Sequence, residues 1–448
     1  MDKNRKQRFI GLGAEALADA LQKLAGQDEA ANDLVERMIA APKENIKRFK
    51  AKLSGLKRMR RFIRWGESAG FARELEAILE DLKAGVEDAR TGAELVAAFY
   101  ETDKGTLGNC DDSSGHVGDV FRYDARKLFV SFASRCDDKE WLADIVFKLN
   151  MEDDYGVRDS LIDCAVEYLP EPAICTLIDR FQIAAGKETD EYRKRHWLSL
   201  VGSLARQIKD ALLFEKTRIA SWGKLSTAAC VDIARVYLES SDALTALSWL
   251  ERIPEKDTFQ ADERDKLLLE IHGRLGNLGK QAEVAWRIFR RHRSADSLAE
   301  LLAVIGEDQK EQVIFSESKL IHKNRTLSYS DAAFLIEMGR MDEAETYLLD
   351  RIDQLNGDFY GSLLPLAEAM EADGRPLPAT VLYRALLDSI LRRAQTKTYQ
   401  HGVRYLKKLD RLAMSVPDWR DIETHSAYLE MLRQVHGRKS SFWSRYEK

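Results

Sequence analysis

The chain has 448 residues, of which 45% are apolar and 32% are charged, so it can fill two or three cores or one extended repeat array, and it is too apolar for a disordered protein. Its formal net charge of −5 excludes a global field that would attract nucleic acid or a membrane surface. Only 8 prolines occur, which favours long helices joined by short connections.

The chain carries no sign of secretion or membrane insertion. The apolar part of its first 21 residues is interrupted by Glu15 and Asp19, so we expect no signal peptide there. No run approaches the roughly 20 apolar residues that span a bilayer. The 5 cysteines are scattered without zinc-site spacing, as expected for reduced, mostly buried thiols. We expect a soluble, cytoplasmic, bacterial protein without a cofactor.

Apolar residues recur with the helical period of about 3.6 residues from the beginning of the chain. Alternating patterns of the strand type are nearly absent, so we expect an all-α fold. The first three apolar stripes are Leu17, Leu21 and Leu24; then Ile46, Phe49, Leu53, Leu56, Met59 and Ile63; then Leu75, Ile78 and Leu82.

Residues 43–64 are expected to form one basic helix with ten Lys or Arg and one Glu. Its cations can bind phosphates of nucleic acid, an anionic membrane or an acidic partner. The alternative is a solvated helix whose cations meet the acids of the next helix, Glu74, Glu76, Glu80 and Asp81, and the balanced overall charge favours it. The cations predicted for nucleic-acid or anion binding are Lys47, Arg48, Lys50, Lys57, Arg58, Arg60, Arg61 and Arg64.

The stretch CDDSSGHVGDVF, residues 110–121, concentrates acids, serines, glycines and one histidine. An EF-hand is excluded, because the register that puts Gly115 at position 6 puts Cys110 and Phe121 at ligand positions. A looser divalent-metal site remains open, with acids from this loop and from the next helix pair. The predicted ligands are Asp111, Asp112, Asp119, Asp153 and Asp154.

Two other interpretations of the same stretch remain. His116 beside Asp119 and the serines at 113 and 114 has the groups of a nucleophilic site, although such sites are defined by geometry. The interpretation that the residue types favour most is structural: short acids and serines cap helices, and Gly115 and Gly118 permit tight backbone. The later stretch DDYGVRD, residues 153–159, is read in the same way, with Arg158 paired to an acid.

Residues 89–222 predict helix pairs of the HEAT type. In the stretch from Glu140 to Leu169 we expect two amphipathic helices joined at DDYG.

The second half contains a repeat of about 35 residues, in which a turn residue is followed by an alanine that opens an apolar stripe. This spacing is typical of tetratricopeptide-like helix pairs, where the turn residue ends the first helix in the left-handed conformation. A weaker copy has its turn at Gly306. The clear copies have turn residues Ser241, Gly276, Gly339 and Gly374, and alanines Ala246, Ala282, Ala344 and Ala379.

The last fifty residues predict two further helices that cap the array, with the terminal SFWSRYEK packed onto them.

Five stretches occur in order along the chain: GLGAEALADALQKLA, RRFIRWGESAGFARELEAILEDL, DDSSGHVGDVF, DDYGVRDSLI and HGRKSSFW. Together they resemble an uncharacterised bacterial family of helical-repeat proteins, a domain of unknown function. The C-terminal half is also similar to the helical repeats that follow zinc fingers of the SWIM type. The resemblance implies an all-helical fold and no particular activity. The C-x-C…C-x-H pattern of the finger itself is absent, so zinc binding does not follow from it.

The sequence thus predicts an elongated α-solenoid of HEAT-like and tetratricopeptide-like helix pairs. We expect an N-terminal helical segment (1–88), HEAT-like pairs (89–222), tetratricopeptide-like repeats (223–395) and a helical cap (396–448). No catalytic motif is recognisable, so the expected function is that of a scaffold or adaptor that binds a protein or peptide on the repeat surface of residues 225–395. The alternatives are nucleic-acid binding through residues 43–64 and a metal site at residues 111–119.

Overall fold

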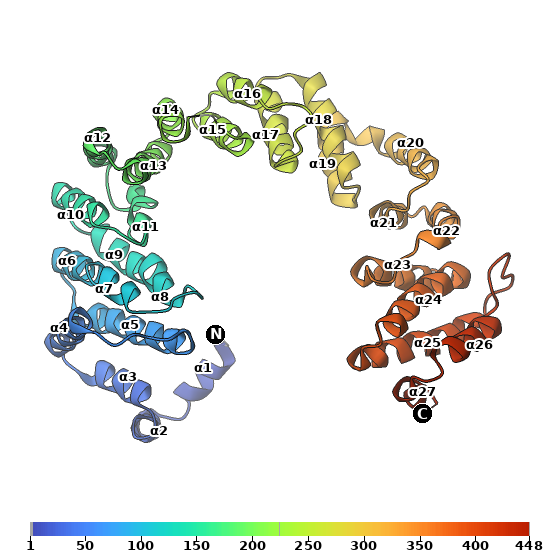
Figure 1. The fold of residues 1–448 in the computed structure, drawn as a ribbon, viewed down its shortest axis with the longest axis horizontal. Helices are drawn as coiled ribbons and strands as arrows, with labels where there is room; N and C mark the ends of the chain where they lie inside the picture. The colour runs from blue at the N-terminus through green and yellow to red at the C-terminus, as the bar shows by residue number, and fades with distance from the viewer. Residues whose placement is uncertain (1–2, 224, 448) are drawn as a thin grey trace. The chain divides into compact units, whose positions relative to one another are not determined.

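The computed structural model describes residues 3–223 and 225–447, and it divides the chain into two compact units, residues 1–259 and 260–448. The prediction of an all-α fold is confirmed: throughout the described residues the regular elements are helices, and the sheet-type pairing is one isolated parallel bridge between Ile63 and Cys110. Figure 1 shows the order of the helices along the chain.

The first unit begins with seven helices before the loop at residues 109–115 and an eighth directly after it. They are α1 (Lys3–Ile10), α2 (Ala14–Ala25), α3 (Glu29–Ile39), α4 (Pro42–Arg58), α5 (Trp65–Gly85), α6 (Ala89–Tyr100), α7 (Asp103–Gly108) and, after the loop, α8 (His116–Asp119). The unit continues with a π-helix, η1 (Val120–Ala125), and then α9 (Arg126–Ala133), α10 (Lys139–Met151), α11 (Asp159–Ile162), η2 (Ala165–Glu167), α12 (Glu171–Lys187), α13 (Glu191–Gln207), α14 (Ala211–Trp222), α15 (Thr227–Glu239) and α16 (Ala243–Glu251).

The second unit is also a succession of helices. They are α17 (Ala261–Arg274), α18 (Leu278–Arg291), α19 (Ala295–Ile305), η3 (Glu307–Gln309), α20 (Lys310–Lys323), α21 (Tyr329–Glu337), α22 (Met341–Leu349), η4 (Ile352–Gln354), α23 (Tyr360–Ala372), α24 (Pro376–Arg393), η5 (Thr396–Thr398), α25 (Tyr399–Ala413), α26 (His425–His436) and α27 (Ser440–Tyr446).

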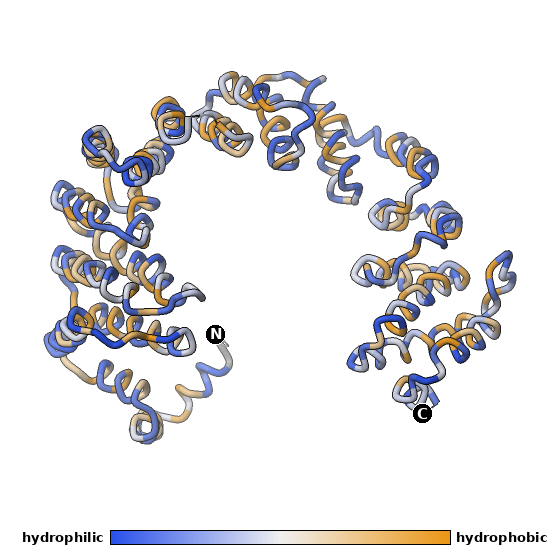
Figure 2. Tube along the Cα trace, in the orientation of Figure 1, coloured by the Kyte–Doolittle hydropathy of each residue, from blue (hydrophilic) through white to orange (hydrophobic). Residues whose placement is uncertain are grey.

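Many consecutive helices pack against each other, such as α12 with α13 in the first unit and α23 with α24 in the second, and the apolar stripes meet along these contacts. In Figure 2 hydrophobic and hydrophilic residues alternate along individual helices, as amphipathic helices require. One apolar core of the first unit runs from Phe49 to Leu204, and one of the second unit runs from Ala285 to Trp443. Four of the cysteines are buried in this packing, and Cys175 on α12 is exposed.

The predicted turns of the repeat are confirmed. Ser241, Gly276, Gly339 and Gly374 all have a positive φ between 69° and 72°. In each case the next residue donates its backbone N–H to the carbonyl five residues back: the four bonds are 242 to 237 (2.9 Å), 277 to 272 (2.9 Å), 340 to 335 (2.8 Å) and 375 to 370 (2.9 Å). This is the Schellman arrangement that closes a helix and reverses the chain.

The sequence did not reveal a fifth turn of the same kind, at Lys209, which has φ 60° and is followed by a bond from the N–H of Asp210 to the carbonyl of Ala205 (2.9 Å). The weaker copy at Gly306 turns differently. Its φ is 105°, and it leads into the short helix η3. Three of the four repeat alanines are fully buried, and Ala282 is half-buried.

Two expectations about helices are wrong. The basic helix ends at Arg58, not at residue 64, because Ile63 leaves the helical path to pair with the chain at Cys110. The second helix expected after DDYG is broken into α11 and η2, since Cys164 between them is not helical.

The two helices expected in the last fifty residues are present as α25 and α26. The terminal segment packs as expected, with Phe442 and Trp443 of α27 buried against α25.

Replacement of Ser241 by glycine is expected to stabilise the first unit by about 1 kcal/mol, because a side chain in the left-handed region costs roughly that much and glycine does not pay it. Urea unfolding measures the change. Ser240→Gly is the matched control: its φ is −84°, so glycine there gains nothing and loses the hydrogen bond from the Ser240 hydroxyl to the carbonyl of Tyr237. Equal effects of the two substitutions would contradict the argument.

Candidate functional site

The end of the basic stretch, residues 59–64, and the acidic loop, residues 109–115, are far apart in the sequence but lie side by side in the first unit. The N–H of Ile63 donates to the carbonyl of Asn109 (2.8 Å), and the N–H of Asp111 donates to the carbonyl of Ile63 (2.9 Å). The hydroxyls of Ser68 and Ser114 also form a hydrogen bond with each other, at 3.4 Å. These contacts fix the start of α5 against the loop that leads into α8.

Within the loop, Asp112 organises the backbone. Its carboxylate accepts hydrogen bonds from the N–H groups of Val117 (2.9 Å) and Gly118 (2.8 Å), which have no helical partner at the start of α8. Gly115 supplies a left-handed turn with φ 78°. Gly118 allows the close approach, because a Cβ there would lie 3.2 Å from the Asp112 carboxylate. The capping role predicted for this stretch is confirmed.

The predicted metal ligands are not brought together. Throughout the residues that the structure describes, no group of three or more His, Cys, Asp or Glu side chains is arranged to hold a metal ion. Asp111 accepts the hydroxyl of Ser113, and Asp119 lies 3.8 Å from Arg122.

The acids of the next helix pair also have other partners. Asp153 accepts the N–H groups of Tyr155, Gly156 and Arg158 at 2.8–2.9 Å, and Asp154 pairs with Lys104 at 2.7 Å. These local bonds explain the acids as loop and surface groups. The expected acid for Arg158 is Asp103, which it binds through two hydrogen bonds of 2.7 Å in the core.

The serines of the loop do not contact His116. The Ser113 hydroxyl donates to Asp111, and the Ser114 hydroxyl lies against Ser68. The groups of a nucleophilic site are therefore present in the sequence but not assembled in the fold.

The predicted phosphate-binding cations separate into two groups. Arg48, together with Lys52, faces the acids Asp33 and Asp81, and Asp81 is fully buried. Of the acids expected to neutralise this helix, Asp81 alone does so. Lys57 pairs with Glu101 at 3.2 Å, and Arg61 pairs with Glu67 at 2.5 Å, both on the surface. The cations that form no ion pair with described residues are Lys47, Lys50, Arg58, Arg60 and Arg64.

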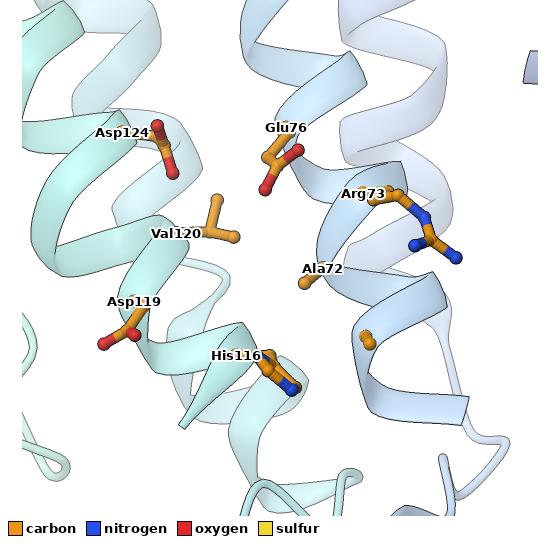
Figure 3. A pocket seen from close by; sticks show the side chains of 8 residues that line it. Ala72, Arg73, Glu76, His116, Asp119, Val120 and Asp124 are labelled. Carbon is orange, nitrogen blue, oxygen red and sulfur yellow. The ribbon is translucent and has the colours of Figure 1, made fainter. Parts of the chain in front are cut away.

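A site that the sequence did not indicate lies between α5 and the segment α8–η1–α9. Two cavities of about 350 and 280 Å³ open there, and they share Glu76 and Asp124. We call them together the α5 groove. Figure 3 shows the larger cavity: Glu76 on α5 and Asp124 on η1 point toward one another across Val120, His116 points toward α5, and Arg73 points away.

The local structure explains this geometry. Residues 120–125 form a π-helix, whose wider turn re-aims the side chains relative to an α-helix and is often found at functional sites. Val120 and Phe121 of this turn are buried, and the carbonyl of Phe121 accepts the hydroxyl of Tyr100 at 2.8 Å. The turn is thus anchored on its inner side, while Asp124 is held on the open side.

The facing carboxylates have no directly bound partner, although Lys83 and Lys127 also line the groove. Neither Glu76 nor Asp124 forms a hydrogen bond or an ion pair through its side chain with any residue that the structure describes. Partial burial, together with Glu80 and Asp119, raises the pKa of the Asp124 carboxyl, against the opposing effect of Lys127. The groove is therefore suited to a cationic group, which would relieve this repulsion. Sequence analysis missed Asp124 because the stretch that contains it, RYDARK at residues 122–127, has the pattern of an ordinary exposed helical face.

Two stretches of the chain, residues 4–221 and 218–445, each match the sequence family described as "Family of unknown function (DUF6880)". The chain belongs to this family. No protein with a curated description matches it.

The DUF6880 copies do not coincide with the two compact units. The first copy ends within α14, whereas the first unit extends to residue 259 and includes α15 and α16, which belong to the second copy. The α5 groove, the acidic loop and residues 58–65 all lie in the first DUF6880 copy. No helix among the described residues is both long and apolar enough to cross a membrane.

Asp112→Ala is expected to lower the free energy of unfolding of the first unit by about 1–2 kcal/mol, because two backbone N–H groups lose their acceptor. The loss is expected to be the same in excess Mg²⁺ or Ca²⁺ as in a chelator. Urea unfolding in both conditions checks this. If either metal stabilises the wild-type protein and this gain is lost in Asp112→Ala, the loop binds a metal and the capping explanation is wrong.

Asp124→Asn is expected to raise Tm at neutral pH. Partial burial raises the pKa of this carboxyl, so its charged form is expected to be disfavoured in the folded state and removal of the charge to stabilise the fold. The gain should shrink as the pH falls through the folded-state pKa, where the wild-type carboxyl is itself protonated. Asp88→Ala is the control of opposite sign: hydrogen bonds from Thr91 lower the pKa of Asp88, so its loss lowers Tm at neutral pH. Thermal melts over a pH series measure both.

Proposed function

We propose that this chain is a protein-binding scaffold or adaptor of the cytoplasm, which holds a protein or peptide partner on the surface of its helix pairs. The observation that carries the proposal is the α5 groove, a pair of open cavities whose facing carboxylates lack a partner among the described residues. Unsatisfied charge in a concave site favours a ligand of the opposite charge. The partner segment is proposed to present a Lys or Arg side chain between Glu76 and Asp124.

The dimensions of the groove agree with a short peptide segment. The two cavities continue one another along α5, from Ala69 to Lys83, and along the opposite wall, from His116 to Ser131. Leu79, Val120 and Leu128 give the floor apolar patches that can accept aliphatic parts of a side chain, such as the methylenes of lysine.

The repeat architecture supports the same class of function. We propose that residues 223–395 are tetratricopeptide-like repeats and residues 89–222 are HEAT-like pairs, similar in the C-terminal half to the repeats found beside SWIM zinc fingers. Arrays of such pairs present extended surfaces to protein partners. The four Schellman turns with nearly equal φ, and the alanines that follow them, support the tetratricopeptide-like assignment. The repeat surface of residues 225–395 is a second proposed contact area for the same partner.

The test is affinity purification of the tagged full chain from its native cell after nuclease treatment. We expect Glu76→Lys combined with Asp124→Lys to lose the specific partner. Glu74→Lys, at an exposed position of α5 two residues away but outside the groove, is the matched control and should keep the partner. Alanine in place of the Lys or Arg of the captured partner segment should weaken binding as well. If the double variant retains every partner that wild type retains, the groove is not the binding site.

A further inference from the structure

Residues 58–65, which run from the last residue of α4 through the connection to the first residue of α5, expose four arginines and two aromatic rings. The sequence of this segment is RMRRFIRW. Ile63 is buried and is held by the two backbone bonds to Asn109 and Asp111. Its neighbours Phe62 and Trp65 are 56% and 63% exposed. The segment is thus fixed at its centre and presents two aromatic rings to solvent.

The cations of this segment are all arginines, and most are not neutralised. Arg60 and Arg64 form no ion pair with any described residue, and the Arg58 guanidinium donates only to the carbonyl of Ser54 (3.1 Å). Arg61 has an exposed partner, Glu67, and exposed pairs are worth little in water. Guanidinium groups bind phosphate oxygens through two parallel hydrogen bonds, which an ammonium group does not do.

The two exposed aromatic rings also lack stacking partners among the described residues. In the described part of the chain neither Phe62 nor Trp65 stacks on another ring or on a cation, although many of the chain's other aromatic side chains do so. Exposed aromatic side chains alternating with arginines are the combination that binds single-stranded nucleic acid without base-specific contacts: bases stack on rings while cations follow the phosphates.

We propose that residues 58–65 form a binding site for single-stranded nucleic acid, with phosphates on Arg60 and Arg64 and bases stacked on Phe62 and Trp65. The site is centred on the connection between α4 and α5 and not on the body of α4. There Arg48 and Lys52 are already engaged by Asp33 and Asp81, and the exposed cations Lys47 and Lys50 flank Phe49, whose ring is buried. The proposal does not rest on the α5 groove, which begins after this segment at Ala69.

An anionic membrane surface is the competing ligand for arginines and aromatic rings. A membrane-binding helix needs a continuous apolar face, whereas this segment turns its aliphatic residue Ile63 into the core and exposes only two separated rings. Rings held apart on a fixed backbone are better suited to separate bases than to a lipid layer.

The first test is fluorescence anisotropy of the full chain with labelled oligo(U) RNA and oligo(dT) DNA of about 16 nucleotides, the upper end of one binding site. We expect binding to both, with a linear fall of log K against log salt. Arg60→Glu combined with Arg64→Glu should weaken binding at least tenfold at about 0.1 M salt and reduce the slope by about 1.4, since each phosphate on a single strand contributes roughly 0.7. Trp65→Ala should weaken it by about tenfold, and Trp65→Tyr should restore most of the loss, because stacking needs a ring.

The matched control is Lys47→Glu with Lys50→Glu, the same charge change on exposed cations of α4, and it should have a smaller effect than the arginine pair. Equal or larger loss in this control would move the site to the helix and overturn the proposal. Absence of binding at low salt, or binding of vesicles of phosphatidylserine and phosphatidylcholine in place of either oligonucleotide, would also overturn it. Far-UV circular dichroism melts of each variant establish that it is folded. A negative result in the nucleic-acid test does not bear on the proposal for the α5 groove, because the partner of the groove is identified after nuclease treatment.

Discussion

The structure depends on buried carboxylates that are bound by arginine and lysine side chains from neighbouring helices. Asp81 on α5 binds Arg37 of α3 and Lys52 of α4. In the second unit, Asp265 on α17 binds two arginines of α18, and Glu317 on α20 binds Arg290 of α18 and Arg293 after it. An apolar stripe can pack in more than one register, whereas a buried charge tolerates only a register that gives it a partner. These pairs therefore determine which helix turns lie opposite each other, and with them the positions of the surface groups.

The α5 groove illustrates how register produces a site. Its two walls belong to α5 and to a π-helix that comes some forty residues later, and neither wall has an unusual composition. Asp81 holds one side of α5, the backbone bridge at Ile63 holds its start, and the Asp112 cap holds the start of the opposite wall. Because both walls are fixed from outside the cavity, Glu76 and Asp124 can remain facing each other without a partner among the described residues. A site of this kind stores unfavourable charge that the surrounding fold tolerates.

Local rules accounted for much of the fold and for little of the site. The turn at Gly339 could be predicted because both of its requirements are local: a residue that tolerates the left-handed conformation, and a small alanine five residues later. The end of α4 at Arg58 could not, because the apolar period continues to Ile63, and only the pairing with Cys110, far along the chain, draws Ile63 out of the helix. The same limit applies to Asp124: an exposed acid in a helical pattern looks solvated until the facing wall is known. The acids at 111–119 left two interpretations open, since a cap and a metal site both require several acids close together in sequence. The hydrogen bonds from Val117 and Gly118 to Asp112 are those of a cap, which the residue types favoured.

The burial of the thiols has a practical consequence. Burial raises the pKa of Cys164 to about 12 and raises the pKa of Cys110 and Cys230 as well, so these groups hold their protons at neutral pH and are shielded from reagents. Cys136 is buried too, which leaves Cys175 on α12 as the one exposed thiol in the part of the chain that the structure describes. A maleimide dye or a nitroxide will therefore attach to the native chain at a single defined position, and the molecule can be followed by fluorescence or electron spin resonance without altering its sequence.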